Sequence, residues 1–173
     1  MEMENYICIN GKKAELTEEQ MKALGIELPN ANPFARTNPW GTFYYIDTIG
    51  LVYETFDDGS CDGENCDSKR FAIANYCTDK AIMEQRALHE TLNRLLWRYS
   101  MMHGGDKIDW CNVSQEKFEI DFTHYKDEEI FEVCSYTITQ NICSVYFTSE
   151  ETAFNAIEEI VKPFIAAHPN FKF

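Results

Sequence analysis

The chain has 173 residues, of which 45% are hydrophobic and 14% aromatic, and its formal net charge at pH 7 is −14. That hydrophobic fraction is enough for a buried core and speaks against intrinsic disorder. The charge speaks against a general nucleic-acid binder, which needs clustered lysine and arginine for phosphate contacts. It is compatible with docking on a basic protein surface, or with a role in solubility alone.

The compartment is predicted from the N-terminus and the cysteines. No run of about 18 apolar residues is present for a transmembrane helix. Glu2 and Glu4 stand where a signal peptide carries positive charge. Seven cysteines, an odd number, indicate reduced thiols rather than a disulfide framework. We therefore expect a soluble cytoplasmic protein.

Residues 1–39 predict a small N-terminal unit of hairpin, short helix and connector. The apolar run Tyr6–Ile9 is followed by Asn10-Gly11, a strong signal for a hairpin turn. Thr17 then caps a short helix, with Gln20 three residues later completing a capping box. The proline-containing stretch 27–39 reads as the connector.

Residues 40–105 predict a first unit of hairpin, strand and long helix. Its expected elements are a hairpin of 42–46 with 51–53, a strand over 71–76, and a helix over 79–103 ended by Gly104-Gly105.

Residues 106–173 predict a second unit in the same order. Here the expected elements are a hairpin of 117–122 with 130–139, a strand over 143–147, and a helix over 150–167 that Pro163 kinks or ends.

The matching order of elements indicates an internal ββ(β)α duplication. The predicted fold class is α+β: antiparallel β-hairpins and sheets packed against two long helices, together with the small N-terminal hairpin-helix unit. We expect the three stretches to form one compact domain.

The first long helix carries two stripes. Leucines and a tyrosine recur at gaps of four, three and four, a coiled-coil-like seam that is a candidate dimer interface: Leu88, Leu92, Leu95 and Tyr99. An arginine stripe on another face either forms salt bridges with Glu90 and nearby acids or contacts a phosphate or acidic partner: Arg86, Arg94 and Arg98.

The loop that begins at Asp57 resembles the first half of a calcium loop, because Asp58, Ser60 and Asp62 alternate before Gly63. The pattern fails at its twelfth position, which is Lys69 instead of a bidentate glutamate. Cys61 and Cys66 lack a matching second ligand pair for zinc, although their spacing leaves a redox pair open. We therefore predict no metal and no cofactor.

Catalytic signatures do not emerge from the pattern either. The four histidines and the serines and cysteines lie in no nucleophile elbow, and Gly104-Gly105 follows a helix instead of preceding one, as a phosphate loop would. We predict a protein that is not an enzyme.

Several stretches, including ENYICINGKKAELTEEQMKALGI, Ile108-Asp109-Trp110 and VYFTSEETAFNAIEEIVKPF, together resemble small acidic proteins of phages and prophages of gut Firmicutes. That group includes type II-A anti-CRISPR proteins, which inhibit Cas9. The resemblance implies a phage-encoded inhibitor of bacterial defence acting in the host cytoplasm, with Cas9 or its guide-RNA complex as the leading partner. The alternative is a dimeric phage accessory or structural protein without catalytic activity.

Inhibition by docking requires acidic contact residues. We predict two groups of them, one in the loop after residue 56 and one in the second hairpin: Asp57, Asp58, Asp62, Glu64 and Asp67, and Asp127, Glu128, Glu129 and Glu132.

Overall fold

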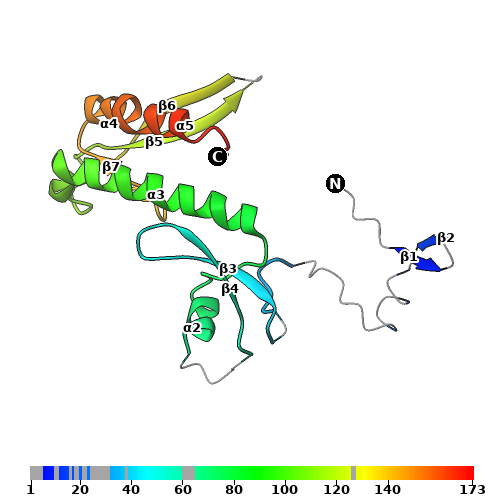
Figure 1. Ribbon diagram of the computed structural model, residues 1–173. Helices are drawn as coiled ribbons and strands as arrows, with labels where there is room; N and C mark the ends of the chain where they lie inside the picture. Colours follow the sequence, from blue (N-terminus) through cyan, green and yellow to red (C-terminus); the bar gives the residue numbers. More distant parts are fainter. Residues whose placement is uncertain are drawn as a thin grey trace. The chain divides into compact units, whose positions relative to one another are not determined.

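A computed structural model describes residues 6–9, 12–15, 17, 20, 23, 32–37, 39–59, 65–125 and 128–173. The protein is a mixed α+β structure with antiparallel strand pairing (Figure 1). It divides into two compact units. The first comprises Met1–Tyr45 and Tyr53–Lys80, and the second comprises Ile46–Val52 and Ala81–Phe173. The long helix therefore groups with the C-terminal half of the chain.

The N-terminal hairpin and the capping box are confirmed. Strands β1 (Tyr6–Ile9) and β2 (Lys12–Glu15) pair antiparallel, with Ile9 opposite Lys12. The backbone N–H of Gln20 donates to Thr17 Oγ1 at 3.3 Å, and the N–H of Thr17 donates back to Gln20 Oε1 at 2.9 Å. Two backbone donors are thus satisfied reciprocally. Residues 18–19, 21–22 and 24–31, which hold most of the predicted short helix and part of the connector, lie outside the described residues.

The first unit is built on the hairpin of β3 (Thr42–Ile46) and β4 (Val52–Phe56) with the short helix α2 (Cys66–Ala72). The aromatic rings of Phe43 and Tyr76 are both buried and stack with centroids 4.0 Å apart. Tyr44 and Cys77 exchange two backbone hydrogen bonds, of 2.7 and 3.0 Å. These contacts tie the segment after α2 to the hairpin.

The strand predicted over 71–76 is wrong. Asn65 accepts a hydrogen bond from the N–H of Ser68 at 2.7 Å and starts α2, which runs through Phe71. The chain then reverses at Ala74, whose φ is 57°, and only Cys77 pairs with β3. The N-cap Asn65, which lies outside the apolar run 71–76, therefore determines the local structure. The first half of the chain lacks the third strand that the predicted duplication requires, so the duplication is not confirmed.

The second unit places helices on one face of a three-stranded sheet, ordered β6-β5-β7. Its hairpin joins β5 (Lys117–Tyr125) to β6 (Glu128–Tyr136), three residues longer on β5 and ending earlier on β6 than predicted. Of the strand expected over 143–147, only β7 (Tyr146–Phe147) forms. A 3₁₀ turn, η1 (Gly105–Lys107), follows the long helix.

One helix of this unit is long. Helix α3 (Lys80–Met102) matches the predicted helix to within a residue at each end. The C-terminal run is divided into α4 (Glu150–Ala156), a π segment η2 (Ile157–Val161) and α5 (Lys162–Ala167). The wide π turn ends two residues before Pro163, which has no N–H to continue the α pattern.

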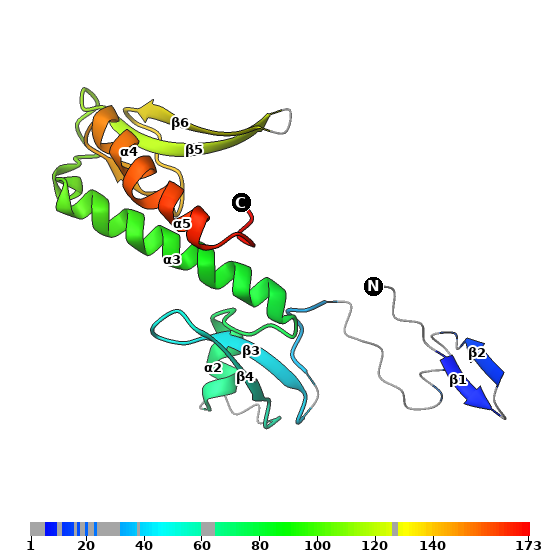
Figure 2. The same ribbon diagram turned by 45° about the horizontal axis from the view of Figure 1, so that its top comes forward.

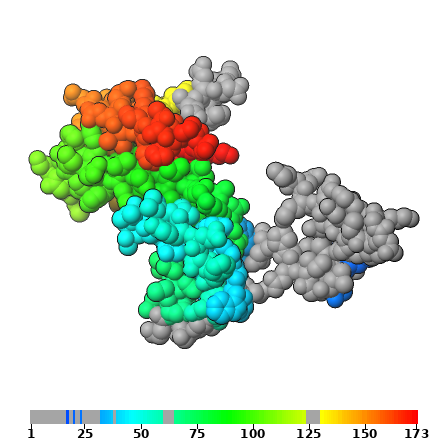
Figure 3. Space-filling view, viewed as in Figure 1, coloured from blue at the N-terminus to red at the C-terminus, as the bar shows by residue number. Residues whose placement is uncertain are grey.

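The core of the second unit lies between α3, the C-terminal helices and the sheet (Figure 2). Buried residues from each come together in two adjoining clusters: Tyr99, Phe147, Ala153 and Ala156, and Leu92, Val161 and Phe164. Figure 3 shows the C-terminal helices, in orange and red, lying against α3, in green. None of the described helices is both long and apolar enough to span a membrane.

Helix α3 ends as predicted at Gly104, whose φ of 89° lies in the left-handed region. A Cβ at this position would meet nothing closer than 3.8 Å, so only backbone strain opposes a side chain. We expect Gly104→Ala to lower the free energy of unfolding by about 1 kcal/mol, measured by urea denaturation. Gly104→Asn should lose less, because asparagine tolerates this conformation. An alanine variant as stable as the parent would contradict this account.

Candidate partner-binding surface

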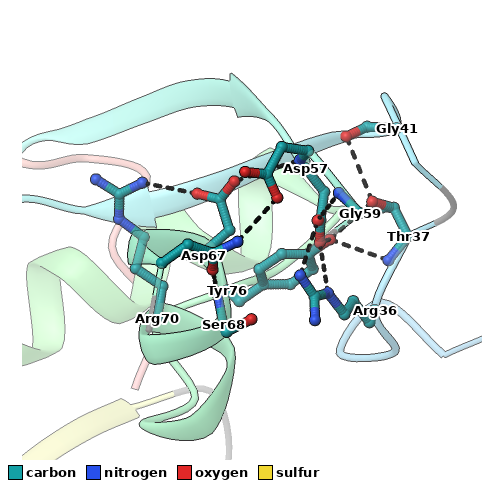
Figure 4. A network of polar contacts seen from close by, with 11 residues as sticks. Arg36, Thr37, Gly41, Asp57, Gly59, Asp67, Ser68, Arg70 and Tyr76 are labelled. Carbon is teal, nitrogen blue, oxygen red and sulfur yellow. Dashed lines mark hydrogen bonds and ion pairs between the residues drawn. The ribbon is translucent and has the colours of Figure 1, made fainter. Parts of the chain in front are cut away.

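Asp57, the first residue of the predicted acidic loop, is fully buried in the first unit. Arg36 donates to both of its carboxylate oxygens, from Nε at 2.8 Å and Nη2 at 2.9 Å (Figure 4). The hydroxyl of Tyr76 and the N–H of Gly59 also donate to it, at 2.9 and 2.8 Å. A carboxylate so enclosed cannot contact a partner, which corrects its assignment as a contact residue.

The same contacts fix the ionisation of Asp57. The hydrogen bonds from Arg36 hold its pKa below the ordinary value of 3.8 and outweigh burial, which opposes the charge. Tyr76 shows the reverse effect. Burial is the largest cause raising the pKa of its phenol, and the neighbouring Asp57 carboxylate raises it further. The network is therefore an internal ion pair with a neutral tyrosine bridging it to Thr37, whose Oγ1 lies 2.7 Å from the Tyr76 hydroxyl.

Two further acidic-loop residues lie beside this network. One carboxylate oxygen from each of Asp57, Asp58 and Asp67 lies within 4.8 Å of the other two. Asp67 pairs with Arg70 at 3.2 Å, and Asp58 accepts from the side-chain amide of Asn65 at 2.9 Å. The charge of Asp67 is thus matched by an arginine, as that of Asp57 is, whereas Asp58 is exposed and binds a neutral amide. Asp62 and Glu64 lie outside the described residues, as do the loop positions Ser60, Cys61 and Gly63.

The arginine stripe of α3 forms salt bridges along the helix. Glu90 binds Arg86 Nε and Arg94 Nη2, both at 2.9 Å, one turn to each side. These bonds match the salt-bridge interpretation of the stripe for Arg86 and Arg94. Arg98 is exposed on the same helix.

The leucine seam of α3 lies in the core of its own unit. Leu92 and Tyr99 are buried members of the two core clusters, and Leu88 and Leu95 pack against the cluster around Val161. The seam therefore faces the C-terminal helices of the same chain. Its assignment as a dimer interface is corrected, because those side chains are already covered.

The second hairpin displays carboxylates on the sheet face opposite the core. Successive residues of a strand point to opposite faces. Phe118, Ile120 and Phe122 alternate with Glu119 and Asp121. Phe118 and Ile120 pack against the core clusters, and Phe122 contacts Phe131 of β6 and Phe173. The register places Asp121 directly opposite Glu132 of β6. We call the face formed by Glu119, Asp121, Thr123, Ile130, Glu132, Cys134 and Tyr136 the acidic face.

Glu119 anchors one end of the acidic face. It is only 7% exposed, and it accepts hydrogen bonds from Asn141 Nδ2 at 2.8 Å and Ser144 Oγ at 2.5 Å. These bonds fasten the loop between β6 and β7 over the sheet. Asp121 is half-buried and Glu132 is exposed, so these two are accessible carboxylates of the face.

Lys117, at the same end, contributes little positive charge to the surface. Its ammonium group is fully buried with its side chain and donates to the carbonyls of Asn112 and Thr137, each at 2.8 Å. It also lies 5.3 Å from the centre of the Trp110 ring. Its charge therefore lies beneath the surface, and the accessible charged groups described on the acidic face are carboxylates.

The nearby carboxylates raise the pKa of two neighbouring groups, Cys134 and Tyr136. The Cys134 thiol donates a hydrogen bond to Asp121, which is the largest cause raising its pKa, followed by burial and by the charges of Asp121, Glu132 and Glu119. The Asp121 charge is also the largest cause raising the pKa of Tyr136. Both groups therefore stay neutral over a wider pH range than usual.

Of the predicted contact residues in this hairpin, Glu132 lies on the acidic face. Glu128 and Glu129 belong to β6, but their side chains lie outside the described set, as does all of Asp127. The sequence reading missed Glu119 and Asp121. Their alternation with phenylalanine and isoleucine was the available signal, and only the register shows that Asp121 meets another carboxylate.

Two of the four histidines serve helix ends. His103 and His168 each direct Nδ1 at a backbone carbonyl four residues earlier, that of Tyr99 and of Phe164, both at 2.8 Å. The Tyr99 carbonyl also accepts the backbone N–H of His103 at 3.2 Å, so the imidazole adds a second contact to a carbonyl of the last helical turn.

Comparison with models of protein families, with curated proteins and with solved structures found no match for this chain.

The Asp57 network predicts an acid-sensitive first unit. Since folding depresses the pKa of Asp57, its stabilisation is complete above the ordinary value of 3.8 and is lost as pH falls through the lower folded value. Asp57→Asn should cost about 3 kcal/mol at pH 7, because it leaves Arg36 without its carboxylate. Hydrogen exchange of amides in 41–59 would measure both effects.

The matched control is Asp67→Asn, which removes a partly exposed ion pair and should cost less than about 1 kcal/mol. Equal losses in the two variants, or an unchanged pH dependence in Asp57→Asn, would contradict the assigned role of Asp57.

The raised pKa of Cys134 predicts slow alkylation. At pH 8 the nearby carboxylates keep the thiol protonated, and only the thiolate reacts. Asp121→Asn should lower that pKa and speed the reaction of Cys134 with iodoacetamide, followed by mass spectrometry at each cysteine. Exposed Cys143 provides the internal control and should react at the same rate in both proteins. No change at Cys134 would argue against the hydrogen bond to Asp121.

Proposed function

We propose that this protein is a non-catalytic inhibitor that binds a basic surface of another protein through its acidic face. The observation that carries the proposal is the pairing of Asp121 with Glu132 across the hairpin. Like charges directly opposite in a sheet destabilise it, by about 0.2–1 kcal/mol. A fold selected for stability alone would place a neutral or oppositely charged residue at one of these two positions.

A cationic partner would relieve this repulsion. Lysine or arginine side chains that lie between Asp121 and Glu132 gain from both carboxylates and remove the cost of holding them together. The net charge of −14 adds long-range attraction, which raises the rate of encounter with a basic surface. The proposal therefore predicts binding that weakens as salt rises.

Aromatic side chains at the end of the face suit an interface. Tyr136 is half-buried beside the carboxylates, and Trp110 packs edge-on against Tyr146 at 4.8 Å. Tyrosine and tryptophan are enriched among residues that dominate binding energy. A partner that covers this end would gain both apolar contact and the adjacent charge.

The resemblance to small acidic phage proteins gives the proposal a first partner to test. Type II-A anti-CRISPR proteins inhibit Cas9, whose channel for nucleic acid is positively charged. Carboxylates displayed on a sheet could occupy a surface that otherwise binds phosphates. On this proposal the protein acts in the cytoplasm of a bacterial host and binds Cas9 or its guide-RNA complex.

The decisive experiment compares stability with binding in one variant. Glu132→Gln should raise the free energy of unfolding by about 0.2–1 kcal/mol, because it removes the repulsion. The same variant should bind the Cas9–guide RNA complex more weakly, with a smaller dependence on salt, as measured by pull-down and calorimetry at two salt concentrations.

The matched control is Glu116→Gln, which removes one exposed carboxylate just before β5. It keeps the Asp121–Glu132 pair, so it should change stability and binding little. If the parent captures no Cas9 at low salt, Cas9 is not the partner. If Glu132→Gln binds a captured partner as tightly as the parent, the acidic face is not the binding surface.

A further inference from the structure

Strand β6 forms a border of the three-stranded sheet. The strand order is β6-β5-β7, and within the described part of the chain no strand pairs with the far side of β6 (Figure 2). The strand is nine residues long, Glu128–Tyr136. An open strand of this length presents a row of backbone N–H and C=O groups that another chain can pair with.

The register shows which backbone groups face outward. Only two residues separate Tyr125 from Glu128, and residues that flank so short a connection form a hydrogen-bonded pair. Hydrogen-bonded and non-hydrogen-bonded pairs alternate from there. This alternation directs the backbone groups of Phe131, Val133 and Ser135 away from β5.

The two faces of β6 have different chemistry. On the core side, Phe131 and Val133 pack with the apolar residues of β5 and the helices. On the other side Glu132 is exposed, with Asp121 directly behind it on β5. A strand added beside β6 would place alternate side chains next to this carboxylate pair and the intervening ones next to the apolar side.

We propose that β6 binds an extended, basic segment of a partner protein by β-strand addition. Main-chain hydrogen bonds to the open border would hold the segment, and lysine or arginine at alternate positions would meet Asp121 and Glu132. This inference rests on the proposed function and identifies the kind of segment that the acidic face recognises.

The charge of the face argues for this occupant over a second copy of the chain. Two β6 strands placed side by side would bring their Glu132 carboxylates close together, and like charges across strands repel. Charged residues are a common protection of open strands against self-association. The same carboxylates attract a cationic strand, so they select between the two.

The probe for this test is a synthetic nine-residue peptide that alternates lysine and valine. We expect the full-length protein to bind it, in fluorescence anisotropy at low salt, at least about tenfold more tightly than a peptide that alternates glutamate and valine. Methylating the backbone nitrogens along one side of the lysine peptide should weaken binding about tenfold while keeping its charge. If the lysine peptide binds as tightly after methylation as before, whichever of its two sides is methylated, strand addition is wrong.

A substitution in the protein, instead of in the peptide, tests the same open border of β6. Ser135 is exposed, and its outward N–H has no predicted intrachain role, so Ser135→Pro should fold and remove one donor. We expect about tenfold weaker peptide binding, with Ser135→Thr, which keeps the N–H, as the matched control. The methylated peptides supply the answer if the proline variant fails to fold.

The outcomes separate this inference from the proposed function. If Glu132→Gln weakens peptide binding but Ser135→Pro and methylation do not, the acidic face binds cations without strand addition, and only this inference fails. If the lysine peptide binds no better than the glutamate peptide, the inference fails on its charge preference. Capture of a basic host protein by the parent would then still support the proposed function.

Discussion

The alternation of side chains along β5 and β6 is the constraint on which the second unit depends. Phe118 and Ile120 supply part of one wall of the core that holds α3 and the C-terminal helices, and Phe122 on the same face contacts Phe131 and Phe173. The same alternation sends Glu119 and Asp121 to the opposite face, where the register brings Asp121 to Glu132. Core and candidate binding surface are thus two sides of one hairpin, and neither can shift without the other.

The two groups of acidic residues differ in how their charge is matched by their surroundings. Asp57 is enclosed by Arg36, Tyr76 and Gly59, and its charge is matched inside the first unit. Asp121 faces Glu132, and no ion pair among the described residues engages either carboxylate, while the buried ammonium of Lys117 binds two carbonyls. Compensated carboxylates stabilise a fold, whereas uncompensated ones are available for a partner.

Sequence patterns predicted the elements whose signals are local. The length of α3, its glycine end, the Thr17 capping box and the second hairpin all follow from periodicity and turn chemistry within short windows. The segment 71–76 was misread because its apolar alternation fits a strand, while the N-cap that makes it part of a helix lies at Asn65.

The candidate site was predicted only in part, for a physical reason. Glu132 was identified by its charge, but the significance of Asp121 depends on the strand register, which no local pattern specifies. Asp57 was assigned to the surface because an acidic loop is normally exposed, and its burial depends on Arg36, 21 residues earlier. The leucine seam of α3 had the spacing of a dimer interface, and spacing does not say which helix covers it.

The buried ammonium of Lys117 stabilises the strand register at one end of the hairpin. Its two carbonyl partners, Asn112 and Thr137, lie in the segments that lead into β5 and out of β6. A register shift of one residue between the strands would separate that ammonium from its carbonyl acceptors. It would also move the phenylalanine side chains from the core face to the solvent-facing side of the sheet. The contacts of Lys117 therefore help to fix the spacing between Asp121 and Glu132, which lie several residues further along the strands. On the proposed function, a ligand would meet a pair of charges whose spacing is already fixed.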